Sequence, residues 1–260
     1  MQLNIKGLSK SYGQGEPVLK GLDLEVAGSG ITAIIGSSGA GKSTLLRCIN
    51  RLIEPDSGTV LLGGTDLTGL KGAALREARR SIGMIFQGFN LLDRLTVMEN
   101  VLAGRLGYVN FWQAAGRRYP QSDVNRAYEL LGLVGMQDFV NQRASRLSGG
   151  QRQRVGVIRA LMQEPSIILA DEPTASLDPR TSEQIMELLR DVSNRFNLPV
   201  LINIHNVDQA RTYTDRIVGL RYGRIIFDDV PGSLDGSALD AIYDGQAWNQ
   251  PQESEAESAT

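Results

Sequence analysis

A glycine-rich segment near the N-terminus has the residue types and spacing of a phosphate-binding loop. It reads Gly-Ser-Ser-Gly-Ala-Gly-Lys-Ser over residues 36–43, after an apolar run and before a helical pattern. Glycines let the backbone curl so that successive N–H groups point at an anion, and the following helix N-terminus adds a favourable dipole. This context predicts a nucleoside triphosphate site rather than a plain glycine turn before a helix. The residues expected to bind ATP here are Gly36, Ser37, Ser38, Gly39, Ala40, Gly41, Lys42, Ser43 and Thr44.

Three side chains at the end of this loop have separate expected tasks. Lys42 should reach the β- and γ-phosphates, which makes it a catalytic as well as a binding residue. The hydroxyl of Ser43 should ligate Mg²⁺, and Thr44 should contact the α-phosphate.

Two carboxylates end a later apolar run. Residues 167–170 read Ile-Ile-Leu-Ala, and Asp171 and Glu172 follow directly. An acidic group at the carboxyl end of a strand can hold Mg²⁺, directly or through water, so Asp171 is a predicted metal ligand. Glu172 would then accept a proton from the attacking water, or orient that water. Two solvated acids after a core strand are the alternative, which is common in isolation but less so beside a phosphate loop.

The apolar patterns predict an α/β fold around these motifs. Runs at 31–35, 167–170 and 200–204 lack alternation, as in strands buried on both faces, and helical patterns such as 181–196 separate them. This order favours a parallel sheet covered by helices. Residues 3–8 and 22–26 alternate apolar and polar positions, which indicates a mainly antiparallel sheet with one wet face.

Other stretches define the predicted domain organisation. From about residue 90 to residue 160 the pattern is mostly helical, which indicates a helical subdomain inserted into the core, and 217–220 with 224–228 indicate a hairpin. We expect one ATPase domain over residues 1–230 and a C-terminal extension over 231–260, whose last 15 residues, polar and acidic, are expected to be disordered.

Composition narrows the function classes. A formal net charge of -2 argues against binding nucleic acid through a broad basic surface. No stretch approaches the roughly 18 apolar residues of a membrane span, and no signal peptide is visible. The lone Cys48 cannot form an internal disulfide and is expected to be a packed thiol. These features predict a soluble cytoplasmic domain.

A third motif carries a family resemblance. Residues 147–151 read Leu-Ser-Gly-Gly-Gln, before an apolar helical pattern and upstream of the two carboxylates. This run resembles the signature of the ABC-type ATPases, and the resemblance implies their P-loop NTPase fold with an antiparallel β subdomain. In that family the signature binds the γ-phosphate of ATP held by the opposite subunit. A hydroxyl and bare N–H groups at a helix start suit that task, although Ser-Gly-Gly alone would be only a helix cap. The resemblance adds Ser148, Gly149, Gly150 and Gln151 to the expected ATP-binding residues.

Four more positions match family motifs in the expected order. Gln87 resembles the Q-loop glutamine, which senses Mg²⁺ or water and links the core to the helical insertion. Asp178 lies in a run resembling the D-loop, which crosses the dimer interface. His205, the single histidine, resembles the switch histidine that contacts the γ-phosphate. Tyr12 resembles the aromatic that stacks on adenine, but it could equally be a surface aromatic near a strand end.

The resemblance also implies partners. ATP would be shared between two copies of the chain, with the signature of one copy completing the site of the other. Membrane-embedded permease subunits would dock on the helical insertion, and a periplasmic or lipid-anchored solute-binding protein would act through them. The chain would then lie at the cytoplasmic face of the inner membrane as a peripheral protein.

Three passages resemble the phosphonate-importer ATPases. They are residues 104–118, the segments 142–144 and 159–163 that flank the signature, and the run 203–216 around His205. Asn206 departs from the glutamine expected there, and Thr174 is the broader family's residue. The expected cargo is therefore a phosphonate, with phosphite, hypophosphite or another small solute as alternatives.

Soluble ABC ATPases of DNA repair, translation or cluster assembly are the rival class. Repair ATPases carry a long coiled coil, and this chain has no sustained heptads. Translation-type members usually carry two ATPase halves, and this chain has one set of motifs. A simple P-loop kinase would not need residues 147–151, and a protein using ATP only as a structural ligand would be expected to lose Glu172.

Overall fold

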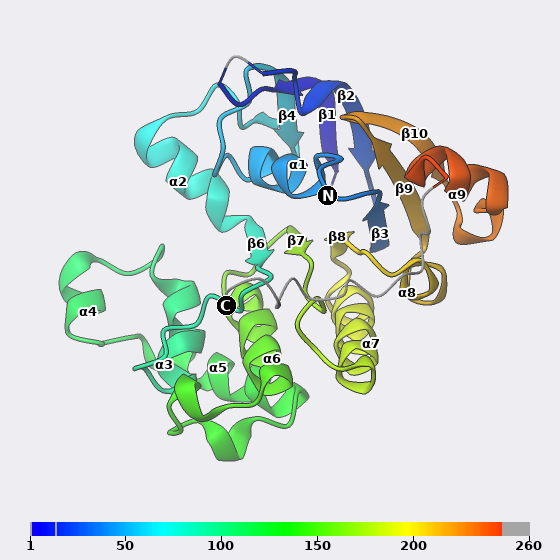
Figure 1. The fold of residues 1–260 in the computed structure, drawn as a ribbon. Coiled ribbons are helices and arrows are strands. Elements are labelled where there is room, and N and C mark those ends of the chain that lie inside the picture. The colour runs from blue at the N-terminus through cyan, green and yellow to red at the C-terminus, as the bar shows by residue number, and fades with distance from the viewer. Residues whose placement is uncertain (1, 14, 246–260) are drawn as a thin grey trace, which may run out of the picture.

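Two sheets form the upper part of the molecule in the computed structural model, which describes residues 2–13 and 15–245 (Figure 1). The smaller sheet is antiparallel, as the alternating residues predict. Leu3, Ile5 and Leu8 of its first alternating strand are buried, and this strand pairs with the second one. Its strand order is β2-β1-β4-β5. The strands are β1 (Leu3–Lys10), β2 (Leu19–Val26), β4 (Ser57–Leu62) and β5 (Thr65–Asp66).

The larger sheet has six strands in the order β10-β9-β3-β8-β7-β6. The pairs from β9 to β6 are parallel, and β10 returns antiparallel as the predicted hairpin. Apart from the β9–β10 hairpin, neighbours in this order are far apart in the chain, so the sheet joins segments from both halves of the sequence. The strands are β3 (Gly30–Ile35), β6 (Ile82–Ile85), β7 (Ile167–Asp171), β8 (Pro199–Asn203), β9 (Arg216–Arg221) and β10 (Arg224–Asp229).

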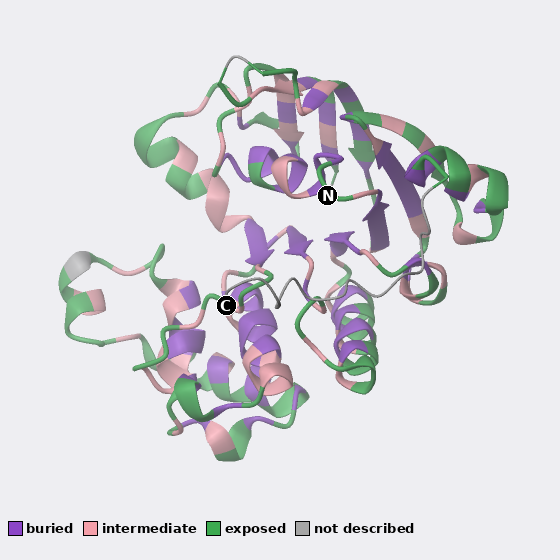
Figure 2. Ribbon diagram, in the orientation of Figure 1, coloured by how far each residue is buried: buried purple, intermediate pink, exposed green. Residues whose placement is uncertain are grey.

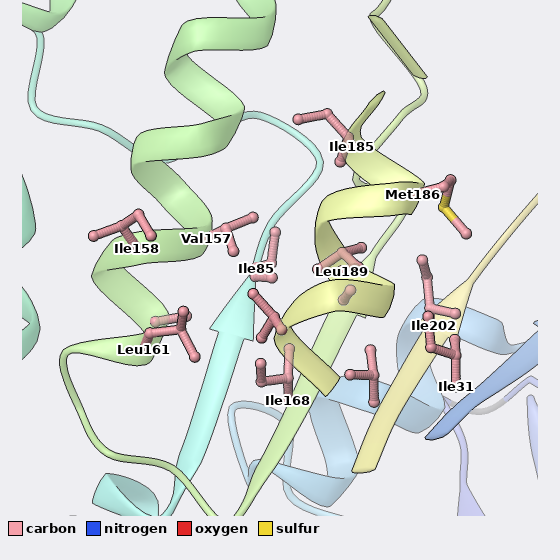
Figure 3. Close-up of a cluster of buried hydrophobic side chains, with 14 of the residues drawn as sticks. Ile31, Ile85, Val157, Ile158, Leu161, Ile168, Ile185, Met186, Leu189 and Ile202 are labelled. Atoms are coloured by element: carbon pink, nitrogen blue, oxygen red, sulfur yellow. The ribbon is translucent and has the colours of Figure 1, made fainter. Parts of the chain in front are cut away.

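Both faces of this sheet are covered, which explains the apolar runs without alternation. Ile31, Ala33 and Ile35 of β3 face a cluster formed with helices, whereas Ile34 faces the cluster shared with the smaller sheet. Figure 3 shows Val157, Ile158 and Leu161 of one helix and Ile185, Met186 and Leu189 of another against Ile31, Ile85, Ile168 and Ile202 of the sheet. These helices are α6 (Gly149–Leu161) and α7 (Pro179–Phe196), and on the other face lies α1 (Lys42–Ile49).

The predicted helical insertion is present in the lower part of the molecule (Figure 1). Between β6 and β7 the structure contains helices and a single isolated bridge, Thr96 to Arg143, but no named strand. Its inward faces are buried, as the purple segments of α3, α5 and α6 show (Figure 2). The elements are α3 (Val97–Leu102), η1 (Ala103–Arg105), α4 (Phe111–Ala115), α5 (Gln121–Leu133), η2 (Gln137–Phe139), η3 (Ala144–Arg146) and α6.

The remaining elements include a C-terminal helix that packs on the sheet. Leu239, Ile242 and Tyr243 of that helix are buried, and a Cβ on Gly219 of β9 would lie 2.6 Å from the Ile242 side chain. Side chains beyond residue 230 therefore belong to the core. The predicted domain boundary at residue 230 stays a prediction. The last 15 residues, predicted to be disordered, lie outside the described residues. The elements are α2 (Gly72–Arg80), α8 (Val207–Tyr213), η4 (Pro231–Ser233) and α9 (Gly236–Tyr243).

None of the helices within residues 2–13 and 15–245 combines the length and apolar character needed to cross a bilayer.

Candidate functional site

The glycine-rich loop joins β3 to α1, as the sequence predicts. Gly36 has φ +149°, and a Cβ there would lie 2.1 Å from the carbonyl oxygen of Leu220, so no other residue fits without moving β9. Lys42 begins α1 and folds back into the loop. Its Nζ donates to the carbonyl oxygens of Gly36 at 2.7 Å and Ser37 at 3.1 Å. Burial lowers the pKa of Lys42.

The carboxyl ends of four neighbouring strands meet at this loop. The strands β3, β8, β7 and β6 are adjacent in the sheet and parallel, so the residues after them lie along one edge. Asp171 ends β7 with 2% exposure, and its Oδ1 accepts the hydroxyl of Ser43 at 2.7 Å. Arg47 donates to the other oxygen at 3.3 Å. The predicted metal ligands Ser43 and Asp171 are therefore in direct contact across 128 residues of chain.

Glu172 and His205 form a second contact at the same edge. Nε2 of His205 lies 2.5 Å from Oε1 of Glu172. Because a carboxylate only accepts, the Nε2 hydrogen is the one donated. This hydrogen bond, followed by the charges of His205, Lys42 and Arg47, lowers the pKa of Glu172. Both the hydrogen bond and the nearby charges therefore favour the ionised form of Glu172, with the histidine oriented toward it.

Glu172, His205 and residues of the phosphate loop line one cavity of about 460 Å³. It brings the phosphate loop together with the predicted base, the predicted switch histidine and Gln87, which follows β6. The volume and the mixture of backbone N–H groups, one lysine and one carboxylate suit a bound polyphosphate. The lining residues are Val18, Ser38, Gly39, Gly41, Lys42, Ser43, Thr44, Gln87, Glu172 and His205.

The oxygen ligands of this cavity fit Mg²⁺. A hydroxyl and a buried carboxylate meet at 2.7 Å beside the phosphate loop, and Gln87 faces the same cavity. That combination matches Mg²⁺, which takes one or two protein oxygens and completes its shell with phosphates and water.

The signature lies elsewhere in the same chain. Ser148 caps α6, and its hydroxyl accepts the N–H of Gln151 while the Gln151 side chain accepts the N–H of Ser148. Gly149 and Gly150 follow at the start of the helix, and a Cβ on Gly150 would lie 2.5 Å from the Thr181 side chain. Residues 148–151 do not line the 460 Å³ cavity. This separation is the one expected if the signature serves the site of a second copy.

Asp178 and Tyr12 also lie outside that cavity. Asp178 caps α7, where its carboxylate accepts the N–H of Thr181 at 3.0 Å. Tyr12 is 51% exposed, and its hydroxyl lies 3.3 Å from the hydroxyl of Thr44. Its ring is therefore beside the loop and open to solvent, a position compatible with stacking on a base.

Two residues that the motifs did not single out contact Asp171. Arg47 is one turn beyond Ser43 on α1, and Asn203 ends β8, where it donates to Asp171 Oδ1 at 2.8 Å. Asn203 could have been singled out in the sequence because it is a polar residue at the end of an otherwise apolar run. The neighbouring positions of β7 and β8 could not be read from the sequence, so the contact was not predicted.

Comparison with known proteins places this fold and site in one class. The family description for ABC transporters matches residues 19–175, more than half of the chain. The chain belongs to the ABC transporter family, as an ATP-binding cassette.

Individual relatives narrow the comparison. A phosphonates import ATP-binding protein of Ruegeria sp. (strain TM1040) is 65% identical over 94% of this chain and 95% of its own length. One of the same description from Nitratidesulfovibrio vulgaris is 57% identical, over 95% of this chain and 94% of its own. Among solved structures, a dimeric ATP-binding cassette in a post-hydrolysis state bound to ADP and Pi has a TM-score of 0.76 and 34% identity, covering 88% of this chain and 98% of the other.

Proposed function

We propose that this chain is the ATP-hydrolysing subunit of an ABC importer that takes up phosphonates. The observation that carries the ATPase part is the 460 Å³ cavity, in which Lys42, Ser43, Glu172 and His205 converge on one space. The cargo assignment is supported by near full-length relatives described as phosphonates import ATP-binding proteins, at 65% and 57% identity.

The proposed binding mode starts from the phosphate loop. The loop N–H groups hold the β-phosphate, and Lys42 leaves the carbonyl oxygens of Gly36 and Ser37 to reach the β- and γ-phosphates. The lowered pKa of Lys42 reflects the burial of an ammonium whose nearby charges, Glu172 and Asp171, compensate only partly. A triphosphate supplies the missing negative charge.

Magnesium has its proposed place beside Ser43, Asp171 and Gln87. When bound, Mg²⁺ would neutralise the charge that develops on the phosphate oxygens. Asp171 and the Ser43 hydroxyl already contact each other, so little reorganisation of these two side chains is needed.

Hydrolysis is proposed to use Glu172 and His205 together. Glu172 accepts a proton from the attacking water, for which a lowered pKa keeps the carboxylate ionised. His205 holds the Glu172 carboxylate at 2.5 Å and reaches the same cavity, where it would contact the γ-phosphate. Gln87 lines the same cavity and would orient the water.

The site is proposed to be completed by a second copy of the chain. Ser148, Gly149 and Gly150 do not line the cavity of their own chain. Ser148 caps the helix that the two glycines begin, and the first N–H groups of a helix suit a γ-phosphate of the partner. A cassette of 34% identity has been solved as a dimer with ADP and Pi. ATP would hold the two copies together, and hydrolysis would release them.

The transport partners follow from the same proposal. Integral-membrane permease subunits would dock on the helical insertion, placing this chain as a peripheral protein at the cytoplasmic face of the inner membrane. A solute-binding protein outside would deliver the phosphonate. The ATPase itself does not contact the cargo.

Co-purification of the tagged chain from its native membranes tests the transporter assignment. We expect a multi-span permease and a phosphonate-type binding protein to accompany it. Recovery with ribosomes or DNA, or with no membrane protein under any nucleotide condition, would leave the ATPase and remove the importer. A binding protein that prefers phosphite or hypophosphite would replace only the cargo.

The Glu172→Gln variant tests the shared site. It should bind ATP without hydrolysing it and accumulate as a dimer on size-exclusion chromatography with light scattering. Lys42→Ala in the same background removes the phosphate cation and should abolish the dimer. A Glu172→Gln variant that stays monomeric with saturating ATP and still turns over would contradict both the dimer and the assigned base.

A further inference from the structure

Asn203 is a fully buried amide at the end of an otherwise apolar strand. Its exposure is 0%, and the preceding residues of β8 are apolar and buried. A buried polar group costs free energy unless it is hydrogen-bonded. An apolar residue would fill this position at lower cost, so the amide calls for a specific partner.

That partner is Asp171. The two residues pair across the parallel strands β7 and β8, and the Nδ2 of Asn203 lies 2.8 Å from Oδ1 of Asp171. The orientation of the amide is fixed by chemistry, because a carboxylate can accept only from the NH₂ side. The same Oδ1 accepts the Ser43 hydroxyl at 2.7 Å. One carboxylate oxygen therefore receives two donors from two different elements.

The other oxygen of Asp171 is held less firmly. Its donor is Arg47, at 3.3 Å, with a side chain that is 46% exposed. An exposed guanidinium gives little orientation because solvent competes for it. Of the donors to Asp171 among the described residues, Asn203 is the fully buried one, and its strand anchors it in the sheet.

The amide oxygen of Asn203 faces a different environment. Oδ1 has no hydrogen-bond partner within the described residues. Asn203 lines a cavity of about 320 Å³ together with Glu172, Thr174, Ser182 and His205. The side chain therefore connects the carboxylate predicted to bind the metal with a cavity that Glu172 and His205 also line.

We propose that Asn203 is the positioning residue for the magnesium ligand Asp171, a proposal that rests on the proposed ATP and Mg²⁺ site. By donating to Oδ1, the amide fixes the plane of the carboxylate that would hold Mg²⁺. Ser43 can then keep its proton on Oδ1 while its oxygen lone pairs remain available to the ion. Outer donors of this kind orient first ligands and change metal affinity by about 10- to 100-fold when removed.

The test measures the metal directly. Mn²⁺ replaces Mg²⁺, and its affinity for the ATP-bound protein is followed by electron paramagnetic resonance, alongside fluorescent ATP binding in EDTA. In Asn203→Leu we expect Mn²⁺ affinity to fall by about 10-fold or more, while nucleotide affinity in EDTA stays within about 2-fold of the wild type. Asn203→Ala removes the same donor with a smaller side chain, and it serves if the leucine variant does not fold. Its Mn²⁺ affinity should fall by the same factor of about 10 or more.

Asn100→Leu is the matched control. Asn100 is also 0% exposed, but its amide serves the backbone of Leu92 and Thr96 in the helical insertion. This variant should lower stability and leave the Mn²⁺ affinity unchanged. Wild-type Mn²⁺ affinity in a folded Asn203 variant would overturn the positioning role alone. Absence of metal-dependent nucleotide binding in the wild type would instead overturn the proposed function.

Discussion

At the residue scale, the geometry of Glu172 combines backbone strain with electrostatic support. Its φ is +49°, in the left-handed region that costs a non-glycine residue about 1 kcal/mol or more. The contact with His205 and the lowered pKa accompany that conformation. Such strain is typical of positions where the side chain must point to a fixed place.

We expect the free energy of unfolding to depend on pH partly through the Glu172 carboxylate. The folded-state pKa of Glu172 is below its ordinary value of 4.5, so the folded chain binds fewer protons than the unfolded chain near that pH. Its stabilising contribution is present above about pH 4.5 and is lost as pH falls through the folded-state pKa. Urea titrations give the free energy of unfolding of the wild type and of Glu172→Gln at each pH. The wild-type value minus the variant value should therefore rise with pH across this window. Glu183→Gln on the exposed face of α7 is the control, and a flat difference for Glu172→Gln would contradict the assignment.

Cys48 gives a second prediction at this scale. Its thiol is buried in α1, and burial raises its pKa to about 11. Because the thiolate is the reactive form, iodoacetamide at pH 8 should leave the folded chain unmodified and label it in urea, as mass spectrometry would show. Labelling of the folded chain at the rate of the unfolded chain would show that α1 opens readily.

At the element scale, the start of α6 has two separable roles. Ser148 caps the helix through a reciprocal pair of hydrogen bonds with Gln151, and it is the proposed contact to the partner's γ-phosphate. Capping needs only an acceptor oxygen, which aspartate also provides. Binding a triphosphate needs a side chain that can donate a hydrogen bond and carries no negative charge.

Two substitutions at Ser148 separate these roles. Ser148→Ala should lower the free energy of unfolding by about 1 kcal/mol through loss of the cap. Ser148→Asp should retain that stability but repel the triphosphate, so in the Glu172→Gln background it should abolish the ATP-dependent dimer. Thermal unfolding and light scattering provide the two readouts. A dimer of undiminished affinity in Ser148→Asp would place this residue away from the nucleotide.

At the scale of the whole molecule, the sequence predicts the parallel core and the site edge well. The apolar runs without alternation form β3, β7 and β8, because a strand buried on both faces has apolar residues on both sides. Lys42, Ser43, Asp171, Glu172 and His205 lie at or beside one cavity because each is close to the end of a strand or the start of a helix at the same edge of the sheet, while their functional roles stay predictions.

Two short elements were not predicted. The strand β5 has only two residues, both exposed, so it has no pattern to detect. The helix α2 is amphipathic, but it has no buried residue and no long apolar run marks it. The contact of Asn203 with Asp171 and the packing of α9 on β9 depend on which strands become neighbours. Spacing along the chain does not contain that information.

The packing of α9 makes a prediction for the whole chain. Ending the chain after Val230 removes Leu239, Ile242 and Tyr243 from the core, and each buried side chain of this size contributes roughly 1.5–3 kcal/mol. The urea midpoint should fall by a large fraction, or the protein should fail to accumulate. A chain ending at Gly245 retains α9 and is the control. Equal stability of the two truncated chains would show that residues 231–245 are dispensable.

The exposed indole of Trp112 on α4 has a practical consequence. It is 80% exposed, and Trp248, the second tryptophan of the sequence, can be replaced by phenylalanine to leave one emitter. Light emitted by an indole in water shifts to shorter wavelength when the ring is covered. Trp112 can therefore serve as a fluorescent reporter on the helical insertion. If permease-containing nanodiscs cover α4, adding them to the Trp248→Phe chain should shift the emission maximum of Trp112 to shorter wavelength.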